Sequence, residues 1–483
     1  MIYKKIERED RIRRMSGTSI FIFRRDYRLV DNLAFMECYR SSSKILPIFI
    51  FTSEQTGKEN EYFSSNSFQF LVESLYDLEN ELKEKYKAKL HYFFGDNISV
   101  LKKIRKEVEY DKIFFNMDYT PYARKRDEEI KKYCDEEEIE CVMKEDYLLY
   151  PMGTIVKKDG LYYQKYTPFK NVGIKMTPQK VVKMTYKSDK FLKKDKIEGE
   201  IDKKRIEGLY KKNEKLISKG GREEAMKILK HPERWNQYKE MRNDLMYQTT
   251  HLSPYIKFGC VSIREVYWDF RETVGLTNGI IEQLLWREFY FYIIYNQPEI
   301  LEKGLPQHMK FAHIKWKNNR DWFEKWKEGK TGYPVVDAGM REMNETGYMH
   351  NRARLIIASI LIKILQIDWR WGEKYLATML VDYDPSVNNG NWQWCAGVGE
   401  NPQDYWRFFS PWKQAMDYDP QCEYIKKWVP ELKDIPDDVV LKWNEKHKEW
   451  KDKTPYPKPI VEFDAELRES TLKMYRESFT YES

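Results

Sequence analysis

Asp368-Trp-Arg-Trp-Gly-Glu373 and Leu380-Val-Asp-Tyr-Asp-Pro-Ser-Val-Asn-Asn-Gly-Asn-Trp-Gln-Trp394 place four tryptophans, the closely spaced carboxylates of Asp382 and Asp384 and two adjacent asparagines within one short segment. Core positions are usually aliphatic, and tryptophan is buried mainly where its indole N–H finds a partner. A tryptophan-rich helix packed under a loop is one interpretation. The alternation of Trp and Gln directly after Asn-Asn-Gly favours the other, the wall of a ligand site.

Two further motifs lie just upstream, Thr331-Gly-Tyr-Pro-Val-Val-Asp-Ala-Gly-Met340 and Met349-His-Asn-Arg-Ala-Arg354. In this order, the three motifs resemble the flavin-binding domain of the photolyase/cryptochrome family, closest to the class I cyclobutane pyrimidine dimer photolyases. The resemblance covers roughly residues 18 to 473 and is densest between 238 and 432. It implies a Rossmann-like α/β N-terminal domain and an all-α C-terminal domain that binds one FAD.

The first part of the chain alternates short apolar runs with amphipathic helical patterns. The runs that read as strands are residues 19–23, 45–51, 90–94, 112–115 and 140–143. Such alternation predicts a doubly wound parallel sheet covered by helices on both faces.

Four segments are predicted from these patterns and the resemblance. They are an N-terminal extension (1–16), an α/β antenna domain (17–145), a connector rich in Pro, Gly and Lys (146–222) and a helical FAD-binding catalytic domain (223–483). The lysines of the connector could meet DNA phosphates, but a solvated face is the favoured interpretation. Met15 could be an alternative start.

The amino-acid composition limits the classes of protein to which this chain can belong. Lys and Arg total 84 and Asp and Glu 77, a modest basic excess that permits DNA binding without proving it. The six cysteines are scattered and form no Cys-x-x-Cys or His cluster, so no metal site is expected. Neither a signal peptide nor an apolar run of 18 residues occurs. We therefore expect a soluble intracellular monomer that does not enter membranes. It would be found in the cytoplasm or the nucleus.

Charged residues follow the first predicted strand as Arg24-Arg25-Asp26. Ligands of doubly wound sheets bind beyond the carboxyl ends of strands, although no Gly-x-Gly-x-x-Gly is present. The resemblance implies that this domain can carry an antenna chromophore, a folate or a deazaflavin. A structural ion-pair network is the favoured alternative for these three residues.

Two segments after residue 223 suit a phosphate-bearing cofactor. Thr249-Thr-His-Leu-Ser-Pro-Tyr255 is a hydroxyl-rich turn entering a helix, where free backbone N–H groups bind anions, although it could be ordinary capping. In the helix predicted over residues 280–295, Gln283, Trp286, Arg287 and Tyr290 share one face. A buried arginine there needs an anionic partner.

The resemblance assigns the cofactor site residue by residue. It implies FAD binding by Tyr238, Thr249, Thr250, His251, Leu252, Ser253, Arg287, Asn351, Arg354, Asp382, Tyr383, Asp384 and Asn388. We expect a buried ion pair between Arg354 and Asp384 beside the isoalloxazine ring. Asn388 would face flavin N5 as a neutral amide.

Roles in electron transfer and substrate binding are implied in the same way. Trp392, Trp369 and Trp316 match the electron-transfer triad, with core packing as the alternative. The catalytic residues would be Gln283, Trp286, Asn351, Asn388 and Trp394, and DNA would meet Arg242, Gln283, Trp286, Tyr290, Asn351, Arg352 and Gln414. Aromatic rings suit unstacked bases.

The implied activity is light-driven repair of UV-damaged DNA by a carbon–carbon lyase, in which reduced FAD gives an electron to a flipped-out cyclobutane pyrimidine dimer. A (6-4) photoproduct photolyase is one alternative: Gln283 is more familiar from those enzymes, but Asn351 and Leu355 stand where they carry histidines. A cryptochrome that signals without repair is the second alternative. The chain lacks the long C-terminal tail usual in that class.

Overall fold

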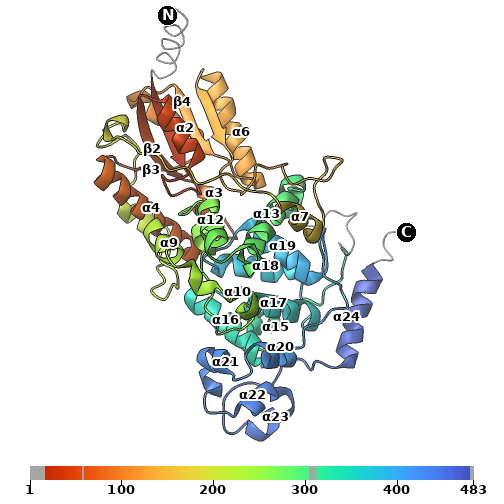
Figure 1. The fold of residues 1–483 in the computed structure, drawn as a ribbon. Helices are drawn as coiled ribbons and strands as arrows, with labels where there is room; N and C mark the ends of the chain where they lie inside the picture. The colour runs from red at the N-terminus through yellow and green to blue at the C-terminus, as the bar shows by residue number, and fades with distance from the viewer. Residues whose placement is uncertain (1–16, 57–58, 304–310, 312, 479–483) are drawn as a thin grey trace, which may run out of the picture.

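The structure is a computed structural model that describes residues 17–56, 59–303, 311 and 313–478. Its N-terminal part is a five-stranded parallel sheet in the spatial order β3-β2-β1-β4-β5 (Figure 1). The strands are β1 (Thr18–Phe23), β2 (Lys44–Phe51), β3 (His91–Phe94), β4 (Lys112–Asn116) and β5 (Glu140–Lys144). Strands are added first on one side of β1 and then on the other, so the predicted doubly wound fold is confirmed.

Both faces of the sheet are buried because successive side chains of a strand point to opposite faces. In β1, Ile20 and Ile22 pack in a core with α5 and α6, whereas Phe21 and Phe23 pack in a core with α2 and α4. The helices of this part are α2 (Leu33–Ser41), α3 (Ser53–Thr56), α4 (Ser65–Tyr86), α5 (Asn97–Glu107) and α6 (Pro121–Glu136). Two-sided burial explains why the strands read as continuous apolar runs.

The segment that follows β5 runs back along the α/β part. The Leu192 N–H donates to the Ile45 carbonyl at 2.8 Å, and Phe191 forms a parallel bridge with Ile45 of β2. Its helices are α7 (Tyr166–Gly173), η1 (Ser188–Lys190), α8 (Lys203–Glu207) and α9 (Arg222–Leu229). Tyr166, Phe169 and Phe191 are buried, so this segment is part of the folded core.

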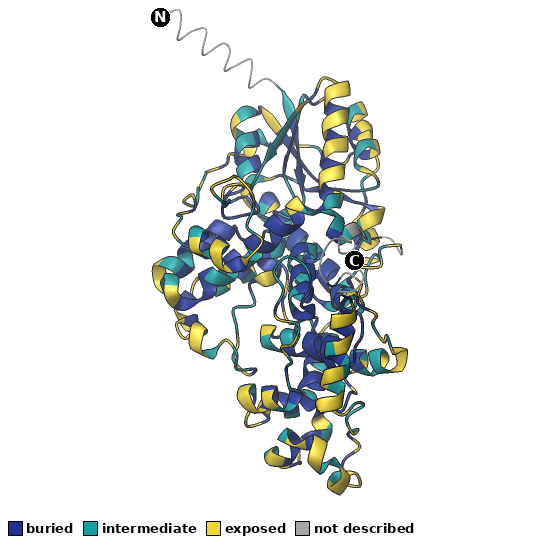
Figure 2. Ribbon diagram, turned by 90° about the vertical axis from the view of Figure 1, so that its right-hand side faces the viewer, coloured by how far each residue is buried: buried dark blue, intermediate teal, exposed yellow. Residues whose placement is uncertain are grey.

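The rest of the described chain is helical, which confirms the predicted all-α part. Its elements are η2 (Pro232–Trp235), α10 (Tyr238–Met241), α11 (Ser253–Lys257), α12 (Ile263–Thr273), η3 (Leu276–Asn278), α13 (Ile280–Asn296), α14 (Glu299–Lys303), α15 (Arg320–Glu328), α16 (Pro334–Thr346), α17 (Asn351–Ser359), η4 (Ile360–Ile364), α18 (Trp369–Met379), α19 (Pro385–Ala396), α20 (Pro411–Tyr418), α21 (Glu423–Trp428), η5 (Pro430–Leu432), α22 (Asp437–Leu441), α23 (Trp443–Trp450) and α24 (Ala465–Glu477). Figure 2 shows buried residues in the sheet and in the middle of the helical part, with exposed residues on the outward sides of helices.

Four buried charges join the two parts of the molecule. Arg264 of α12 donates from Nε to Asp31 at 2.8 Å and from Nη2 to Asp146 at 2.6 Å, and Arg28 also pairs with Asp146. All four side chains are at most 3% exposed. Burial alone would raise the pKa of Asp146, but Arg28 and Arg264 outweigh it and hold that pKa below its usual value.

The backbones also approach closely at this junction. Gly259, which follows α11, has a φ of +61°, and a Cβ at this position would stand 2.2 Å from the Arg25 carbonyl oxygen. The Tyr27 N–H donates to the Phe258 carbonyl at 3.2 Å. Only glycine allows this contact without displacing one of the two backbones.

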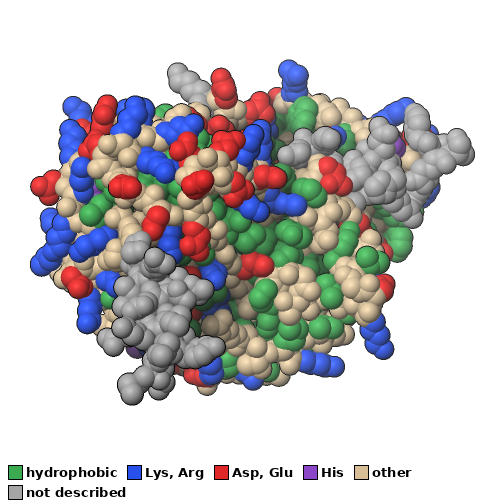
Figure 3. Space-filling model, turned by 90° about the horizontal axis from the view of Figure 1, so that it is seen from above, with side chains coloured by type: hydrophobic (Ala, Val, Ile, Leu, Met, Phe, Trp, Pro, Cys, Tyr) green, Lys and Arg blue, Asp and Glu red, His purple; other side chains and the backbone are tan. Residues whose placement is uncertain are grey.

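The surface carries mixed charge. In the view from above, charged side chains crowd the left-hand part of the molecule and hydrophobic side chains gather near its middle and right (Figure 3). Among the described residues, no helix combines the length and apolarity needed to cross a membrane. The same residues contain no group of three or more His, Cys, Asp or Glu side chains placed to hold a metal ion.

The junction network gives a stability prediction. Arg264→Met leaves Asp31 buried without its cation, and Asp146 keeps only one of its two arginine partners. We therefore expect the free energy of unfolding to fall by about 3–5 kcal/mol in urea denaturation. Arg476→Met is the control, because its partner Glu469 is exposed, and it should change the free energy of unfolding little. Equal losses in the two variants would contradict the importance of the network.

Candidate functional site

A cavity of about 290 Å³ lies in the helical part, between α11, α13, α17 and α19. Every side chain that the resemblance assigned to the cofactor lines it: Tyr238, Thr249, Thr250, His251, Leu252, Ser253, Arg287, Asn351, Arg354, Asp382, Tyr383, Asp384 and Asn388. These residues come from distant parts of the sequence, so the fold alone brings them together.

The start of α19 fixes one wall of this cavity. Asp384 is the N-cap and accepts from the backbone N–H groups of Ser386 at 3.0 Å and Val387 at 3.2 Å, with Pro385 at the first helical position. The other oxygen of Asp384 pairs with Arg25, which also lies 3.1 Å from Asp118. The loop after β1 therefore holds the helix that carries Asn388 and Trp392.

The expected ion pair between Arg354 and Asp384 is wrong. Arg354 Nη2 lies 3.0 Å from Asp382 instead, and Asp382 also accepts from the Ser253 hydroxyl at 2.6 Å. Asp384 is committed to capping α19 and to Arg25, whereas Asp382, two residues earlier, faces α17. Despite its burial, the pKa of Asp382 is held below its usual value by Arg354.

Asn388 is oriented by a second carboxyl group. Its amide donates to the Glu373 carbonyl at 3.1 Å and to Glu373 Oε1 at 2.9 Å, and the Tyr62 hydroxyl is hydrogen-bonded to the same carboxyl. Burial raises the pKa of Glu373 to about 7. The sequence analysis did not identify Glu373 or Tyr62, because nothing in their local pattern points toward Asn388.

Unsatisfied polar atoms show that the cavity suits a polar ligand. Arg287 pairs with the buried Glu288 at 3.2 Å, but its Nη2 atom, like Asp382 Oδ1, is buried without a partner in the described chain. A guanidinium donor matches a diphosphate, and a carboxylate acceptor matches ribose hydroxyls or ring N–H groups. The donor set therefore fits FAD.

The predicted electron-transfer tryptophans differ in their burial. Trp392 lines it, and its ring lies against Gly372 of α18, where a Cβ would stand 2.2 Å from the indole. Trp369 begins α18 and is 3% exposed like Trp392, whereas Trp316 is half-buried. The Lys317 N–H donates to Gln366 at 2.9 Å, which places Trp316 beside the start of that helix. The relay itself stays a prediction.

A second group of predicted residues lies in the lining of the cavity or next to it in sequence, and we call Gln283, Trp286, Asn351 and Trp394 the mouth. Gln283 and Asn351 line the cavity, whereas Trp286 and Trp394 do not and are half-buried outside it. Tyr290 and Gln414 are buried, and the Tyr290 hydroxyl donates to Asn391 at 3.3 Å. Their contact with DNA stays a prediction.

Three guanidinium groups lie close enough to act on one another electrostatically, and one of them, Arg352, follows Asn351 of the mouth. Burial, and then the charges of Arg242 and Arg407, lower the pKa of Arg352, which also donates to Asn243 at 2.7 Å. Arg407 is exposed on the loop between α19 and α20. Sequence reasoning missed it, because no local pattern places that loop next to Arg352. Such a cluster suits phosphate groups.

His350 has a structural role. It is the N-cap of α17, and its Nδ1 accepts the Arg352 N–H at 3.2 Å. Burial lowers the pKa of His350 to about 4, so the ring is neutral at physiological pH.

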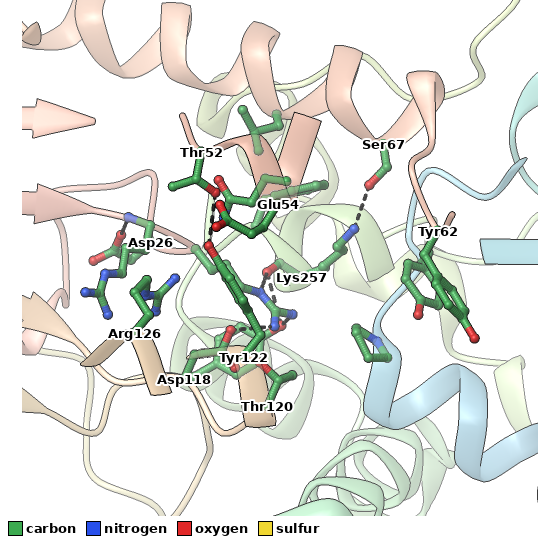
Figure 4. Close-up of a pocket in the computed structure, with 18 of the residues that line it drawn as sticks. Asp26, Thr52, Glu54, Tyr62, Ser67, Asp118, Thr120, Tyr122, Arg126 and Lys257 are labelled. Atoms are coloured by element: carbon green, nitrogen blue, oxygen red, sulfur yellow. Dashed lines mark hydrogen bonds and ion pairs between the residues drawn. The ribbon is translucent and has the colours of Figure 1, made fainter. Parts of the chain in front are cut away.

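A larger cavity of about 620 Å³ opens at the carboxyl ends of the strands (Figure 4). Tyr122 and Thr52 meet there at 3.0 Å, and Lys257 donates to Ser67 at 2.6 Å. Lys257, Tyr147 and Tyr383 line both cavities, so one layer of side chains separates them. Burial lowers the pKa of Lys257 to about 7.

The favoured ion-pair interpretation of the β1 loop is confirmed for both arginines. Arg24 pairs with Asp127, and Arg25 with Asp118 and Asp384. Asp26 accepts hydrogen bonds instead, from the Arg24 N–H at 2.7 Å and the Asn116 amide at 2.6 Å. All but Asp127 and Asp384 also line the larger cavity.

The fold and the cavity define a two-domain flavoprotein, and comparison with known proteins identifies its family. The family models described as "DNA photolyase" and "FAD binding domain of DNA photolyase" match residues 19–182 and 280–477. The chain belongs to the photolyase/cryptochrome family. The resemblance drawn from the sequence, its fold class and FAD as the cofactor are thereby confirmed.

Individual relatives match over nearly the whole chain. A deoxyribodipyrimidine photo-lyase of Buchnera aphidicola is 32% identical and covers 94% of this chain and 96% of its own. An archaeal photolyase structure from Sulfolobus tokodaii with two FAD molecules superposes with a TM-score of 0.83 at 36% identity, covering 95% and 100% of the two chains. A class III photolyase from Agrobacterium tumefaciens gives 0.86 at 28%, covering 96% and 98%.

The raised pKa of Glu373 gives a pH prediction. In the folded protein the Glu373 carboxyl keeps its proton up to about pH 7, whereas in the unfolded chain a glutamate releases it near pH 4.5. The unfolded state therefore loses a proton first, and the free energy of unfolding falls as pH rises from 4.5 to 7. Glu373→Gln cannot release a proton. We expect wild type and variant to be equally stable near pH 4.5, and the variant to be more stable by about 3 kcal/mol at pH 7.5.

Urea denaturation at several pH values measures this difference. Glu324→Gln, on the exposed side of α15, is the control and should show no pH-dependent gain. A difference between wild type and Glu373→Gln that is constant from pH 4.5 to 7.5 would contradict the assignment.

Proposed function

We propose that this protein is a deoxyribodipyrimidine photo-lyase that repairs cyclobutane pyrimidine dimers in UV-damaged DNA, acting as an intracellular monomer. The observation that carries the proposal is that the residues fitting FAD and two residues suited to base edges, Gln283 and Asn351, line one cavity. The Buchnera relative bears the same enzyme name. When bound, FAD supplies light absorption and a one-electron donor to this cavity.

The residues that line the cavity bind the cofactor and orient the groups around it. Arg354 and Asp382 compensate each other's charge inside the cavity, so neither needs water. Asn388 is locked by Glu373 and presents a neutral amide. Gln283 and Asn351 can donate to and accept from the edge of an unstacked base.

The arginines at the mouth suit the DNA backbone. Arg242, Arg352 and Arg407 gather positive charge next to Asn351 of the mouth, and Arg407 is exposed. Contacts of this kind bind phosphates without reading sequence and weaken as salt rises.

The cyclobutane dimer is favoured over the (6-4) photoproduct as substrate. Repair of the latter needs proton transfer, and His350 is neutral and occupied as a helix cap. The other nearby imidazole, His251, is stacked on Tyr348 at 4.4 Å, and burial lowers its pKa. Splitting a cyclobutane ring needs only the electron.

A second chromophore is proposed for the larger cavity. Its position at the strand ends and its mixed lining of Arg24, Lys125, Arg126, tyrosines and phenylalanines suit an aromatic ligand with anionic groups. A folate and a deazaflavin are the candidates from the resemblance. The Sulfolobus relative, whose second FAD was interpreted as a light-harvesting cofactor, adds a flavin.

The function is tested by illuminating the purified flavin-loaded protein with DNA that carries each lesion separately. We expect loss of cyclobutane dimers under blue light and none in darkness, while (6-4) lesions remain. The absorption spectrum of the same sample records any second chromophore. Repair of (6-4) lesions, or of neither lesion, would overturn the proposal.

The tryptophan relay is tested separately. Trp369→Phe should abolish photoreduction of the flavin, because phenylalanine is much harder to oxidise than tryptophan, while a chemically reduced sample still repairs. Trp371→Phe is the matched control, because Trp371 lies on the same helix but packs against Phe323 at 5.2 Å. Photoreduction at the wild-type rate in Trp369→Phe, followed by transient absorption, would discard the relay.

A further inference from the structure

Tyr166 of α7 stacks directly on Trp286. The two ring centroids are 3.4 Å apart with an angle of 11° between the planes. Trp286 is one of the residues that the resemblance assigns to catalysis and to DNA binding, and Tyr166 comes from the segment predicted as a connector. One face of the indole is therefore covered by a residue to which no role has been assigned, while the ring of Tyr290, one turn further along α13, lies 5.7 Å from the indole with 29° between the planes.

Tyr166 is held in place from several sides. Its hydroxyl donates to the Glu282 carbonyl at 2.8 Å, and its ring packs edge-on against Phe289 with centroids 5.8 Å apart. It is 7% exposed. A ring anchored at both its edge and its hydroxyl cannot turn away without losing these contacts, so it is a fixed support.

The flanking residues tie this segment to the rest of the mouth. The Tyr166 N–H donates to Asn401 at 3.3 Å, and Lys165 donates to the Glu400 carbonyl at 2.9 Å. Both partners lie on the loop that also carries Arg407. Arg242, another arginine of the mouth, is near enough to act electrostatically on the Tyr166 hydroxyl.

We propose that Tyr166 is a positioning residue for substrate recognition, which fixes the plane of Trp286 and leaves only the opposite face of the indole for a lesion base. This inference deepens the proposed function and rests on it. With one face covered, a flipped base has a single stacking position, and the indole does not have to be ordered when DNA binds. The connector thus belongs to the substrate site.

The test is the affinity of the flavin-loaded protein, in the dark, for a duplex with one cyclobutane dimer and for the same duplex without it. Tyr166→Leu removes the ring, and we expect the ratio of the two affinities to fall about fivefold, the usual range for loss of an aromatic pair. Tyr166→Phe keeps the ring and should stay within about twofold. Affinity for undamaged DNA should not change, because phosphate contacts are untouched.

Two further variants separate positioning from packing. Tyr163→Leu lies in the same segment but packs on Phe169, and it should leave the ratio unchanged. In a Trp286→Leu background, Tyr166→Leu should have no further effect on the ratio, because the indole that it orients is gone. If Tyr166→Leu does not fold, Tyr166→Met carries the same comparison.

Each contrary outcome has a defined meaning. An unchanged ratio in Tyr166→Leu, or an equal loss with and without Trp286, overturns the positioning role. A higher ratio overturns it too, because Tyr166 would then compete with the base for the indole. Wild-type protein without preference for the dimer overturns the proposed function itself and this inference with it.

Discussion

Burial of charge without water is the constraint on which this architecture depends. Arg28, Asp31, Asp146 and Arg264 are enclosed where the sheet meets the helices, and each charge is tolerated only because an opposite one is in contact. These contacts require the α/β part, the segment after β5 and α12 to be docked in one relative position. The cofactor cavity borders this junction, because Tyr147, next to Asp146, and Val266 of α12 line it.

The same constraint shapes the cavity. Arg25 reaches from the loop after β1 to the N-cap of α19, so the helix that carries Asn388 and Trp392 is anchored to the sheet and not only to its helical neighbours. Because Asp384 is already paired, Asp382 is the carboxylate that forms the ion pair with Arg354. The position of α19 in the cavity wall therefore depends on how the α/β part docks, although no described residue of 17–145 lines the cavity.

Much of this arrangement could be predicted from the sequence, and the limits have physical causes. The strands were found because burial on both faces makes them continuous apolar runs. The residues that line the smaller cavity were predicted as one group because long ordered motifs resemble a family. The partner of Arg354 was assigned wrongly, since two carboxylates two residues apart are indistinguishable until the helix start commits one of them. Tyr166 and Arg407 were missed because their importance comes from contacts between distant segments, which leave no local pattern.

The close approach at Gly259 limits how this molecule can be recombined with its relatives. Because the Arg25 carbonyl occupies the space of a missing side chain, the two halves meet through backbone shape as well as through side-chain chemistry. A chimera that joins this N-terminal half to a foreign helical half would have to inherit a glycine at that position. Domains could be exchanged only between relatives that have a glycine at this position, because only they leave room for the carbonyl of the other half.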